Sequence, residues 1–196
     1  MLESMRLSEL QLPLSGRLVG ADASFTAVST DSRAIEPGQL FIALTGPRFD
    51  GHAYLADVAA KGAVAALVER EVADAGLPQL VVADTRLALG QLGALNRAAF
   101  NGPVAAITGS SGKTSVKEML ASILRSAHGQ DAVLATRGNL NNDLGAPLTL
   151  LELSTSHRSA VIELGASRPG DIAYTVDLVR PDVSVITNAG TAHVGE

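Results

Sequence analysis

The sequence predicts an α/β fold in two parts, a small N-terminal α/β domain over residues 1–101 and a domain built on a mostly parallel sheet over residues 102–196. Three observations support this prediction. Short apolar runs of strand length alternate with stretches of helical periodicity along most of the chain. The tripeptide Asn-Gly-Pro at residues 101–103 is a strong break signal. Directly after it, an apolar run leads into a glycine-rich turn and then a helical pattern, the order found in P-loop proteins.

The first part contains three predicted strands and two predicted helices. Its strands are apolar runs of four to six residues, and its first helix is closed by Gly62, a residue type common just after helix ends. In chain order the predicted elements are a strand at 40–44, a helix at 54–61, strands at 63–68 and 80–83, and a helix at 86–100.

The second part contains four predicted strands, which are apolar almost throughout, as expected where helices cover both faces of a sheet. The strands are at 103–107, 132–135, 160–164 and 183–187, and the helices are at 116–124, 147–153 and 171–179. In a parallel sheet, ligands bind at the edge where the carboxyl ends of the strands meet. We therefore expect the four segments that follow these strands to converge on one site.

Composition excludes several classes of function. The net charge is −5, aromatic residues make up 3 % of the chain and tryptophan is absent, the opposite of what nucleic-acid binding requires. The absence of cysteine excludes disulfides, zinc–thiolate sites and thiol nucleophiles. No apolar run reaches the roughly 18 residues of a membrane span, and the acidic N-terminus is unlike a signal peptide. We expect no membrane span and a cytoplasmic location.

The glycine-rich turn has the composition of a phosphate-binding loop. Its small residues allow successive backbone N–H groups to converge on an anion, its lysine supplies a positive charge, and its last hydroxyl can bind magnesium. The helical pattern that follows would direct the positive end of its dipole at the same anion. Ile107 stands where the standard Walker pattern has glycine, so the turn is shorter than usual. The predicted nucleotide-binding residues are Thr108, Gly109, Ser110, Ser111, Gly112, Lys113 and Thr114.

Three residues near other strand ends are candidates for the same site. Glu163 lies at the end of an apolar strand, where a carboxylate either binds a metal ion or reaches solvent or an arginine. His193 is either a ligand or a structural residue of its turn, and Asn188 either orients a ligand or closes the turn.

Polar loops supply candidates for binding a polar or anionic substrate. The loop at 136–147 contains three asparagines and an arginine, although asparagine also favours turns in general. Two polar segments in the first part contain arginines that would suit the phosphates of a nucleotide sugar, and each segment could equally be an ordinary turn. The candidate residues are Ser32, Arg33, Arg48, Asn139, Asn141 and Asn142.

These segments, in their order along the chain, resemble the Mur ligases, the ATP-dependent ligases that build the peptide of bacterial peptidoglycan precursors. The resemblance covers essentially the whole chain. In the first part it is carried by Thr-Asp-Ser-Arg at 30–33, Pro-Gly-Gln-Leu-Phe-Ile-Ala at 37–43 and Phe-Asp-Gly-His at 49–52. In the second part it is carried by the loop at 108–114 and the segments at 137–151, 163–167 and 187–193. The last three segments look like those of the members that join D-alanyl-D-alanine to a UDP-N-acetylmuramoyl-tripeptide.

The resemblance implies a role for each candidate residue. Lys113 would contact the β- and γ-phosphates of ATP, Thr114 and Glu163 would bind Mg²⁺, and His193 would bind a second Mg²⁺ ion. Lys113, Glu163 and His193 would thus be the catalytic residues. The loop asparagines would face the substrate, and the first part, as a UDP-sugar-binding domain, would hold the uridine end. We also expect a monomer, and the composition indicates no nucleic-acid partner.

The family pattern continues beyond this sequence. It includes a carbamylated lysine shortly after the histidine segment and then a C-terminal domain, whereas this chain ends at Glu196. We therefore expect the ATP-binding domain to be incomplete at its C-terminus and this chain alone to be inactive. Alternatives are the preceding family member, which adds the third amino acid, a P-loop hydrolase or kinase, and a non-catalytic module that binds nucleotide sugar or ATP.

Overall fold

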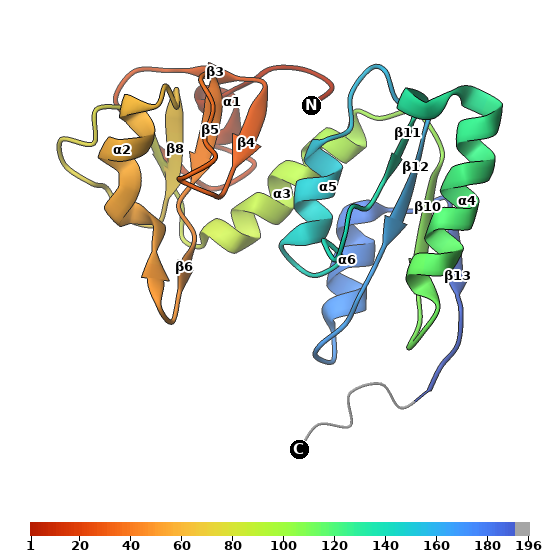
Figure 1. The fold of residues 1–196 in the computed structure, drawn as a ribbon. Coiled ribbons are helices and arrows are strands. Elements are labelled where there is room, and N and C mark those ends of the chain that lie inside the picture. Colours follow the sequence, from red (N-terminus) through yellow and green to blue (C-terminus); the bar gives the residue numbers. More distant parts are fainter. Residues whose placement is uncertain (191–196) are drawn as a thin grey trace. The chain divides into compact units, whose positions relative to one another are not determined.

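The computed structural model describes residues 1–190 and contains two compact units (Figure 1). The first unit comprises Glu3–Gln91 with Met1, and the second comprises Leu92 and the residues after it, with Leu2. Both units contain helices and sheets with parallel strands, which confirms the predicted α/β class.

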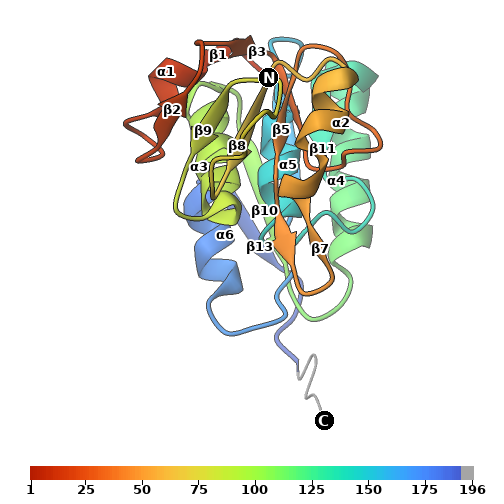
Figure 2. The same cartoon turned by 90° about the vertical axis from the view of Figure 1, so that its left-hand side faces the viewer.

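The first unit is built on a five-stranded sheet in the order β2-β9-β8-β5-β4. Strand β2 is antiparallel to β9, and the other neighbours are parallel. Figure 2 shows β9, β8 and β5 of this sheet in that order. The strands are β2 (Arg17–Val19), β4 (Ala27–Ser29), β5 (Gln39–Ile42), β8 (Ala65–Val68) and β9 (Gln79–Val81).

Helix α2 covers one face of this sheet, and its buried Leu55 and Val58 pack in one cluster with Phe41 of β5 and Ala66 of β8. Strands β2 and β4 were not predicted, and neither were the smaller elements of the unit, because most elements of two to four residues are too short to show a periodic pattern. The smaller elements are β1 (Met5–Arg6), α1 (Leu7–Leu10), β3 (Ser24–Phe25), the hairpin of β6 (Thr45–Gly46) and β7 (Phe49–Asp50), and the 3-10 helix η1 (Gly51–Tyr54); α2 itself is Leu55–Ala60.

Helix α3 (Thr85–Ala98) contains the division between the units, which lies at residues 91 and 92. The sequence places the break at 101–103, ten residues later. The second half of the helix belongs to the second unit because of its contacts there. The Asn96 side chain donates to the carbonyl oxygens of Leu150 and Leu153, at 2.8 and 3.0 Å.

The second unit contains a four-stranded sheet in the order β11-β12-β10-β13, and all its neighbouring strands are parallel. Helix α4 packs on one face, and α5 and α6 pack on the other (Figure 1). The strands are β10 (Val104–Thr108), β11 (Val133–Ala135), β12 (Ser159–Glu163) and β13 (Val183–Ile186). The helices are α4 (Lys113–His128), the 3-10 helix η2 (Gln130–Ala132), α5 (Gly145–Leu151) and α6 (Asp171–Val179).

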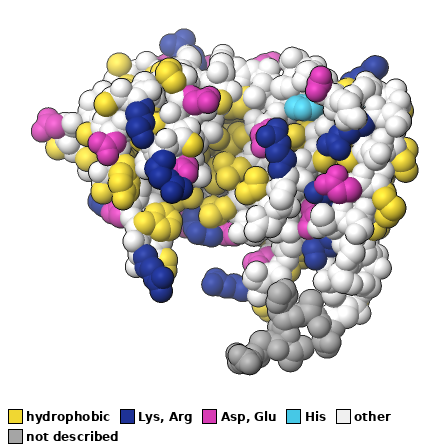
Figure 3. Space-filling view, in the orientation of Figure 1, with side chains coloured by type: hydrophobic (Ala, Val, Ile, Leu, Met, Phe, Trp, Pro, Cys, Tyr) yellow, Lys and Arg dark blue, Asp and Glu magenta, His cyan; other side chains and the backbone are white. Residues whose placement is uncertain are grey.

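Strand β13 differs from the prediction that helices bury both faces of every strand. Val183 is 60 % exposed and Ile186 is 69 % exposed, so the prediction is wrong for β13. The reason is its position at the edge of the sheet, where β10 is its only partner among the described strands. Met119 and Ile123 of α4 are also exposed, and Figure 3 shows hydrophobic side chains at the surface along the edge that carries α4.

The surface bears charges of both signs. On the face shown in Figure 3, basic and acidic side chains are interspersed rather than gathered into one basic patch. In the part of the chain that the structure describes, no helix is both long and apolar enough to cross a membrane.

Candidate active site

The loop between β10 and α4 depends on two glycines with positive φ, Gly109 at +137° and Gly112 at +78°. A Cβ atom on Gly112 would meet no atom within 4 Å, so that glycine is needed for its conformation alone. A Cβ atom on Gly109 would lie 2.1 Å from Thr187 Oγ1, at the end of β13. Gly109 is therefore required both for its backbone conformation and for the close approach of the loop to Thr187, which follows β13.

Helix α4 begins at Lys113, directly after the loop. The first backbone N–H groups of a helix have no partner within the helix, and the helix dipole adds positive potential there. The Lys113 ammonium lies close by and donates to the Gly109 carbonyl oxygen at 2.7 Å. A cavity of about 320 Å³ opens beside the loop, and its walls are formed by Thr108, Gly109, Ser110, Lys113, Ala166, Ile172, Asn188, Ala189 and Gly190.

Glu163 lies at the end of β12 and is only 2 % exposed. Its carboxylate accepts hydrogen bonds from the Thr114 hydroxyl at 3.0 Å and from the Asn141 side-chain amide at 2.8 Å. Glu163 is the last residue of β12, Thr114 lies at the start of α4 after β10, and Asn141 lies in the loop after β11. The three side chains thus meet at the carboxyl end of the parallel sheet. The structure brings together Thr114 and Glu163, which the sequence assigns to the same metal ion.

The three asparagines of the loop after β11 have different environments. Asn141 is partly buried and donates to Glu163, as described above. The Asn142 side chain accepts from the backbone N–H groups of Leu144 and Gly145, at 3.3 and 2.8 Å, and so binds free N–H groups at the start of α5. Asn139 is exposed.

Asn188 contacts the loop at residues 108–114, hereafter the phosphate loop, through both groups of its side-chain amide. Its oxygen accepts from the Ser111 N–H at 3.0 Å, and its nitrogen donates to the Ser111 hydroxyl at 2.7 Å. His193, the predicted third metal ligand, lies outside the described residues. Among residues 1–190, no group of three or more histidine, cysteine, aspartate and glutamate side chains is arranged to hold a metal ion.

Lys117 is a buried cation that sequence analysis did not identify. It is 1 % exposed, and its ammonium donates to the Thr136 carbonyl oxygen at 2.7 Å. The Thr136 hydroxyl in turn accepts from the Glu163 N–H at 2.9 Å. A signal was present in the sequence, because Lys117 lies one helical turn after Lys113 and one turn before the apolar Ala121.

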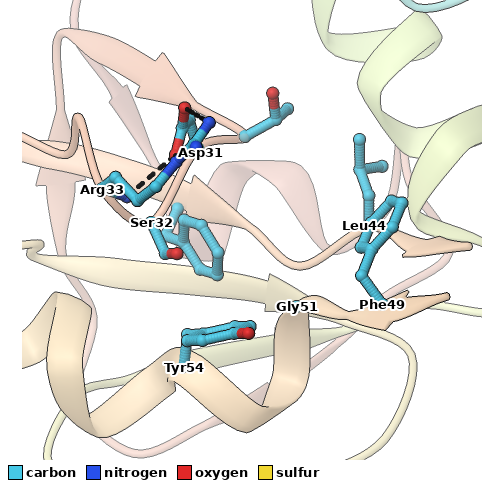
Figure 4. A pocket seen from close by; sticks show the side chains of 9 residues that line it. Asp31, Ser32, Arg33, Leu44, Phe49, Gly51 and Tyr54 are labelled. Carbon is cyan, nitrogen blue, oxygen red and sulfur yellow. Dashed lines mark hydrogen bonds and ion pairs between the residues drawn. The ribbon is translucent and has the colours of Figure 1, made fainter.

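The first unit contains a cavity of about 460 Å³, which is shown in Figure 4. Two predicted residues, Ser32 and Arg33, line it, whereas Arg48 is an exposed residue of the turn between β6 and β7 and does not. The aromatic rings of Phe49 and Tyr54 were missed. The complete lining is Thr30, Asp31, Ser32, Arg33, Phe41, Leu44, Phe49, Gly51 and Tyr54.

The charges of this pocket are already paired within the loop. Arg33 donates from Nε and Nη2 to the two oxygens of Asp31, at 2.9 and 2.8 Å, and its side chain folds back over Asp31 in Figure 4. These side-chain hydrogen bonds, with a further bond from the Arg33 N–H, lower the pKa of Asp31 to about 2. An anion that binds Arg33 must therefore share the guanidinium with Asp31.

His52 is buried and binds Asp50, the neighbour of the cavity-lining residue Phe49. The Nδ1 atom of His52 lies 2.6 Å from Asp50 Oδ1, and its Nε2 accepts from the Glu69 N–H at 2.9 Å. Nδ1 must therefore carry the proton and donate to Asp50. The hydrogen bond from Arg70, followed by those from His52, lowers the pKa of Asp50 below its usual range. These contacts fix the end of the hairpin to the end of β8.

Two family models match the sequence. The Mur ligase middle domain matches residues 107–196, and the model described as the Mur ligase family, catalytic domain, matches residues 24–97. Among curated proteins, UDP-N-acetylmuramoyl-tripeptide–D-alanyl-D-alanine ligase of Escherichia coli is 51 % identical over 97 % of this chain and 41 % of its own length. The ligase of the same name from Bacillus subtilis is 39 % identical over 85 % of this chain and 36 % of its own length.

Solved structures agree with these matches. The structure titled MurF from Acinetobacter baumannii has a TM-score of 0.90 and 50 % identity, and the match covers 100 % of this chain and 43 % of that one. The MurF ligase of Thermotoga maritima in complex with ADP has a TM-score of 0.77 and 35 % identity, over 86 % of this chain and 38 % of that one. The chain thus spans about two fifths of the length of these relatives.

Proposed function

The chain belongs to the Mur ligase family, and we propose that it carries the nucleotide-binding regions of an ATP-dependent ligase. In this proposal the ligase joins D-alanyl-D-alanine to a UDP-N-acetylmuramoyl-tripeptide during the synthesis of peptidoglycan precursors, in the cytoplasm. Sequence identity supports this substrate class, because relatives with that name match 97 % of the chain at up to 51 % identity.

The observation that carries the proposal is the convergence of the phosphate loop, Thr114 and Glu163 at the carboxyl end of one parallel sheet. The loop presents small residues, the start of a helix and one lysine to the same cavity. These are the features by which proteins bind nucleotide phosphates. We assign the phosphates of ATP to residues 108–114, with Lys113 neutralising charge on the β- and γ-phosphates.

The chemistry follows from the need to activate a carboxylate. The terminal carboxylate of the peptide attacks the γ-phosphorus of ATP, the bond from this phosphorus to the β–γ bridging oxygen breaks, and ADP leaves. The amine of D-alanyl-D-alanine then attacks the carbonyl carbon of the acyl phosphate, loses a proton and displaces phosphate. Positioning and charge neutralisation are the main contributions that a protein makes to such phosphoryl transfer. The Lys113 ammonium would stay beside the γ-phosphoryl group and neutralise its negative charge during the transfer.

The residues beside the loop fit a magnesium ion. The nearly buried Glu163 carboxylate and the Thr114 hydroxyl, 3.0 Å apart, are oxygen donors of the kind that Mg²⁺ prefers. Thr114 and Glu163 would hold one ion, and His193, outside the described residues, would hold a second. When bound, Mg²⁺ stabilises negative charge on phosphate oxygens. Asn141 would keep the Glu163 carboxylate in place through its 2.8 Å hydrogen bond.

We assign the UDP end of the substrate to the cavity of the first unit. Its aromatic side chains, Phe49 and Tyr54, offer apolar surface to a base, and Ser32 and Arg33 offer donors to a diphosphate. Arg48 is exposed outside the cavity lining, so a contact from it requires a ligand that extends over the turn. Asn139, also exposed, stays a candidate for contacting the peptide end.

Two titrations and one turnover assay test the proposal. Calorimetry should show that the chain binds ADP and, separately, a UDP-N-acetylmuramoyl-tripeptide. Lys113→Ala should weaken ADP binding by at least about tenfold, because an ionic contact is worth roughly 1.5–3 kcal/mol, and should leave binding of the UDP-sugar unchanged. Arg158→Ala is the control, because it removes the same charge from an exposed residue just before β12.

Turnover is measured on the protein as its gene encodes it. The proposal expects ADP release only when the UDP-tripeptide and D-alanyl-D-alanine are both present. ADP release with ATP alone would indicate a hydrolase, and release with an unrelated acceptor would indicate a kinase. Binding of both ligands without turnover would indicate a binding module.

A further inference from the structure

The segment Thr187–Gly190, which follows β13, contacts the phosphate loop along most of its length. Asn188 binds Ser111 through both groups of its amide, as described above. The Thr187 hydroxyl donates to the Ser111 carbonyl oxygen at 2.6 Å. The Ser110 hydroxyl donates to the Gly190 carbonyl oxygen at 2.8 Å and accepts from the Gly190 N–H at 2.9 Å. Both serines of the loop are thus bound from outside the loop.

The contact is close because no side chain separates the two segments. An added Cβ atom on Gly109 would overlap with Thr187 Oγ1, at 2.1 Å, and would lie in tight contact with the backbone N and O of Asn188, at 3.1 Å. The loop itself is short and consists of glycine and serine, residue types that favour no single backbone conformation. Its observed shape is therefore stabilised by hydrogen bonds, one within the loop from Lys113 to Gly109 and the others with Thr187–Gly190.

We propose that Asn188 is a positioning residue that holds Ser111, and with it the phosphate loop, in the conformation that receives nucleotide. The inference rests on the proposed function, because it concerns the same ATP site. The two groups of an asparagine amide allow it to accept from the Ser111 N–H and donate to the Ser111 hydroxyl at once. A loop that is ordered before binding loses less conformational entropy when the phosphates bind. Asn188 thus acts on nucleotide affinity through Ser111.

Hydrogen exchange on the nucleotide-free chain tests the contact itself. In Asn188→Ala, the Ser111 amide should exchange about tenfold faster, because the bond to its N–H and the bond to its hydroxyl are lost together. Ser111→Ala keeps the N–H contact and should show a smaller change at the same amide. Asn101→Ala is the matched control, because it makes the same substitution at an exposed residue before β10. Unchanged exchange at Ser111 in Asn188→Ala would overturn the proposal.

Calorimetric titration with ADP tests the consequence. Asn188→Ala should raise the dissociation constant for ADP about tenfold, in line with the exchange result, while the chain stays folded and its melting temperature falls by no more than about 2–4 °C. Asn101→Ala should change neither. Faster exchange at Ser111 with unchanged or tighter ADP binding would overturn the positioning role, because Asn188 would then be a neutral contact or a competitor of the phosphates. If the unmodified chain does not bind ADP, the proposed function fails and this role fails with it, whereas the exchange measurement still decides whether the contact exists.

Discussion

At the scale of single residues, the shape of the site depends on Gly109. It combines a φ of +137° with a distance of 2.1 Å between an added Cβ atom and Thr187 Oγ1. Gly129, after α4, also has a positive φ, at +99°, but an added Cβ atom there would meet nothing within 4 Å. An alanine at Gly129 would therefore cause backbone strain alone, whereas an alanine at Gly109 would cause backbone strain and a steric clash.

We predict that Gly109→Ala abolishes measurable ADP binding, because the loop must move away from Thr187 to accommodate the methyl group. Gly129→Ala should lower stability by roughly 1 kcal/mol through backbone strain alone and should leave ADP binding intact. Calorimetric titration and thermal unfolding of both variants give the two quantities. Normal ADP binding by a folded Gly109→Ala variant would show that the loop does not need its contact with Thr187.

We expect the Glu163 carboxylate to bind Mg²⁺ in addition to any role in folding. We predict that Glu163→Gln keeps the shape of the side chain but loses most of the gain in ADP affinity that Mg²⁺ provides, because a neutral amide is a weak ligand for a hard cation. The measurement is ADP titration with and without Mg²⁺. The control is Glu152→Gln, which alters a partly exposed carboxylate paired with Arg137. An equal effect of Mg²⁺ in both variants would remove Glu163 from the metal site.

Sequence reasoning placed Lys113, Thr114 and Glu163 correctly at one edge of a sheet, because the order of strand, loop and helix fixes their positions. It could not assign partners to Asn141 and Asn188. An asparagine amide bonds to whichever group tertiary contacts place beside it, and these partners lie 22 and 77 residues away in the sequence. The burial of Lys117 was missed for a similar reason, since its partner Thr136 lies on a different element.

At the scale of secondary structure, one arginine joins the end of α3 to the end of α6. The guanidinium of Arg97 donates to the carbonyl oxygens of Val179, Phe100 and Arg180, at 2.8, 3.0 and 3.0 Å. Arg97 is 9 % exposed, and burial lowers its pKa. Its three acceptors include carbonyls at the C-terminal end of α6, which have no partner within the helix.

We predict that Arg97→Met lowers the free energy of unfolding of the second unit by about 2–4 kcal/mol, because it leaves buried carbonyl groups without donors. The control is Arg158→Met, which removes an exposed arginine from the same unit and should change stability by less than about 0.5 kcal/mol. Of the two tyrosines in the chain, Tyr174 lies in the second unit. In a Tyr54→Phe background, tyrosine fluorescence during urea unfolding therefore reports on this unit alone. Equal midpoints for the two variants would contradict the role of Arg97.

Most long elements were predictable to within a few residues, including α6, whose bounds match the predicted helix at 171–179. Their apolar residues repeat at helical spacing or form uninterrupted runs. The hairpin of β6 and β7 was not predictable from such patterns, because each strand has two residues. It is held by contacts of Asp50 with His52 and Arg70, which pair residues from different elements.

At the scale of the whole molecule, the chain consists of two units, and α3 contains the division. The first half of α3 includes Ala88 and Leu89, which are 1 % and 0 % exposed and belong to the first unit. A fragment that ends before α3 would lack this buried surface. The Asn-Gly-Pro break marks the end of the helix, and it does not show where along the helix the packing changes.

We predict that residues 1–100 fold alone and unfold cooperatively on heating, whereas residues 1–84 do not. The reason is the apolar area that α3 buries, since each fully buried leucine contributes roughly 2 kcal/mol. Circular dichroism with thermal melting distinguishes the two fragments. Equal cooperativity would show that the first unit does not need α3. If residues 1–100 fold but fail to bind a UDP-N-acetylmuramoyl-tripeptide, the assignment of the UDP site to this unit is wrong.

The central claim is that the phosphate loop serves a ligase that activates a peptide carboxylate as an acyl phosphate. The most direct test labels the terminal carboxylate of the UDP-N-acetylmuramoyl-tripeptide with ¹⁸O and follows the label during turnover by the protein as its gene encodes it. The account predicts that each phosphate released in the presence of ATP and D-alanyl-D-alanine carries one ¹⁸O atom from the carboxylate, and that Lys113→Ala releases none. Phosphate that carries oxygen from water alone, or labelled carboxylate that stays intact while ADP accumulates, would contradict it.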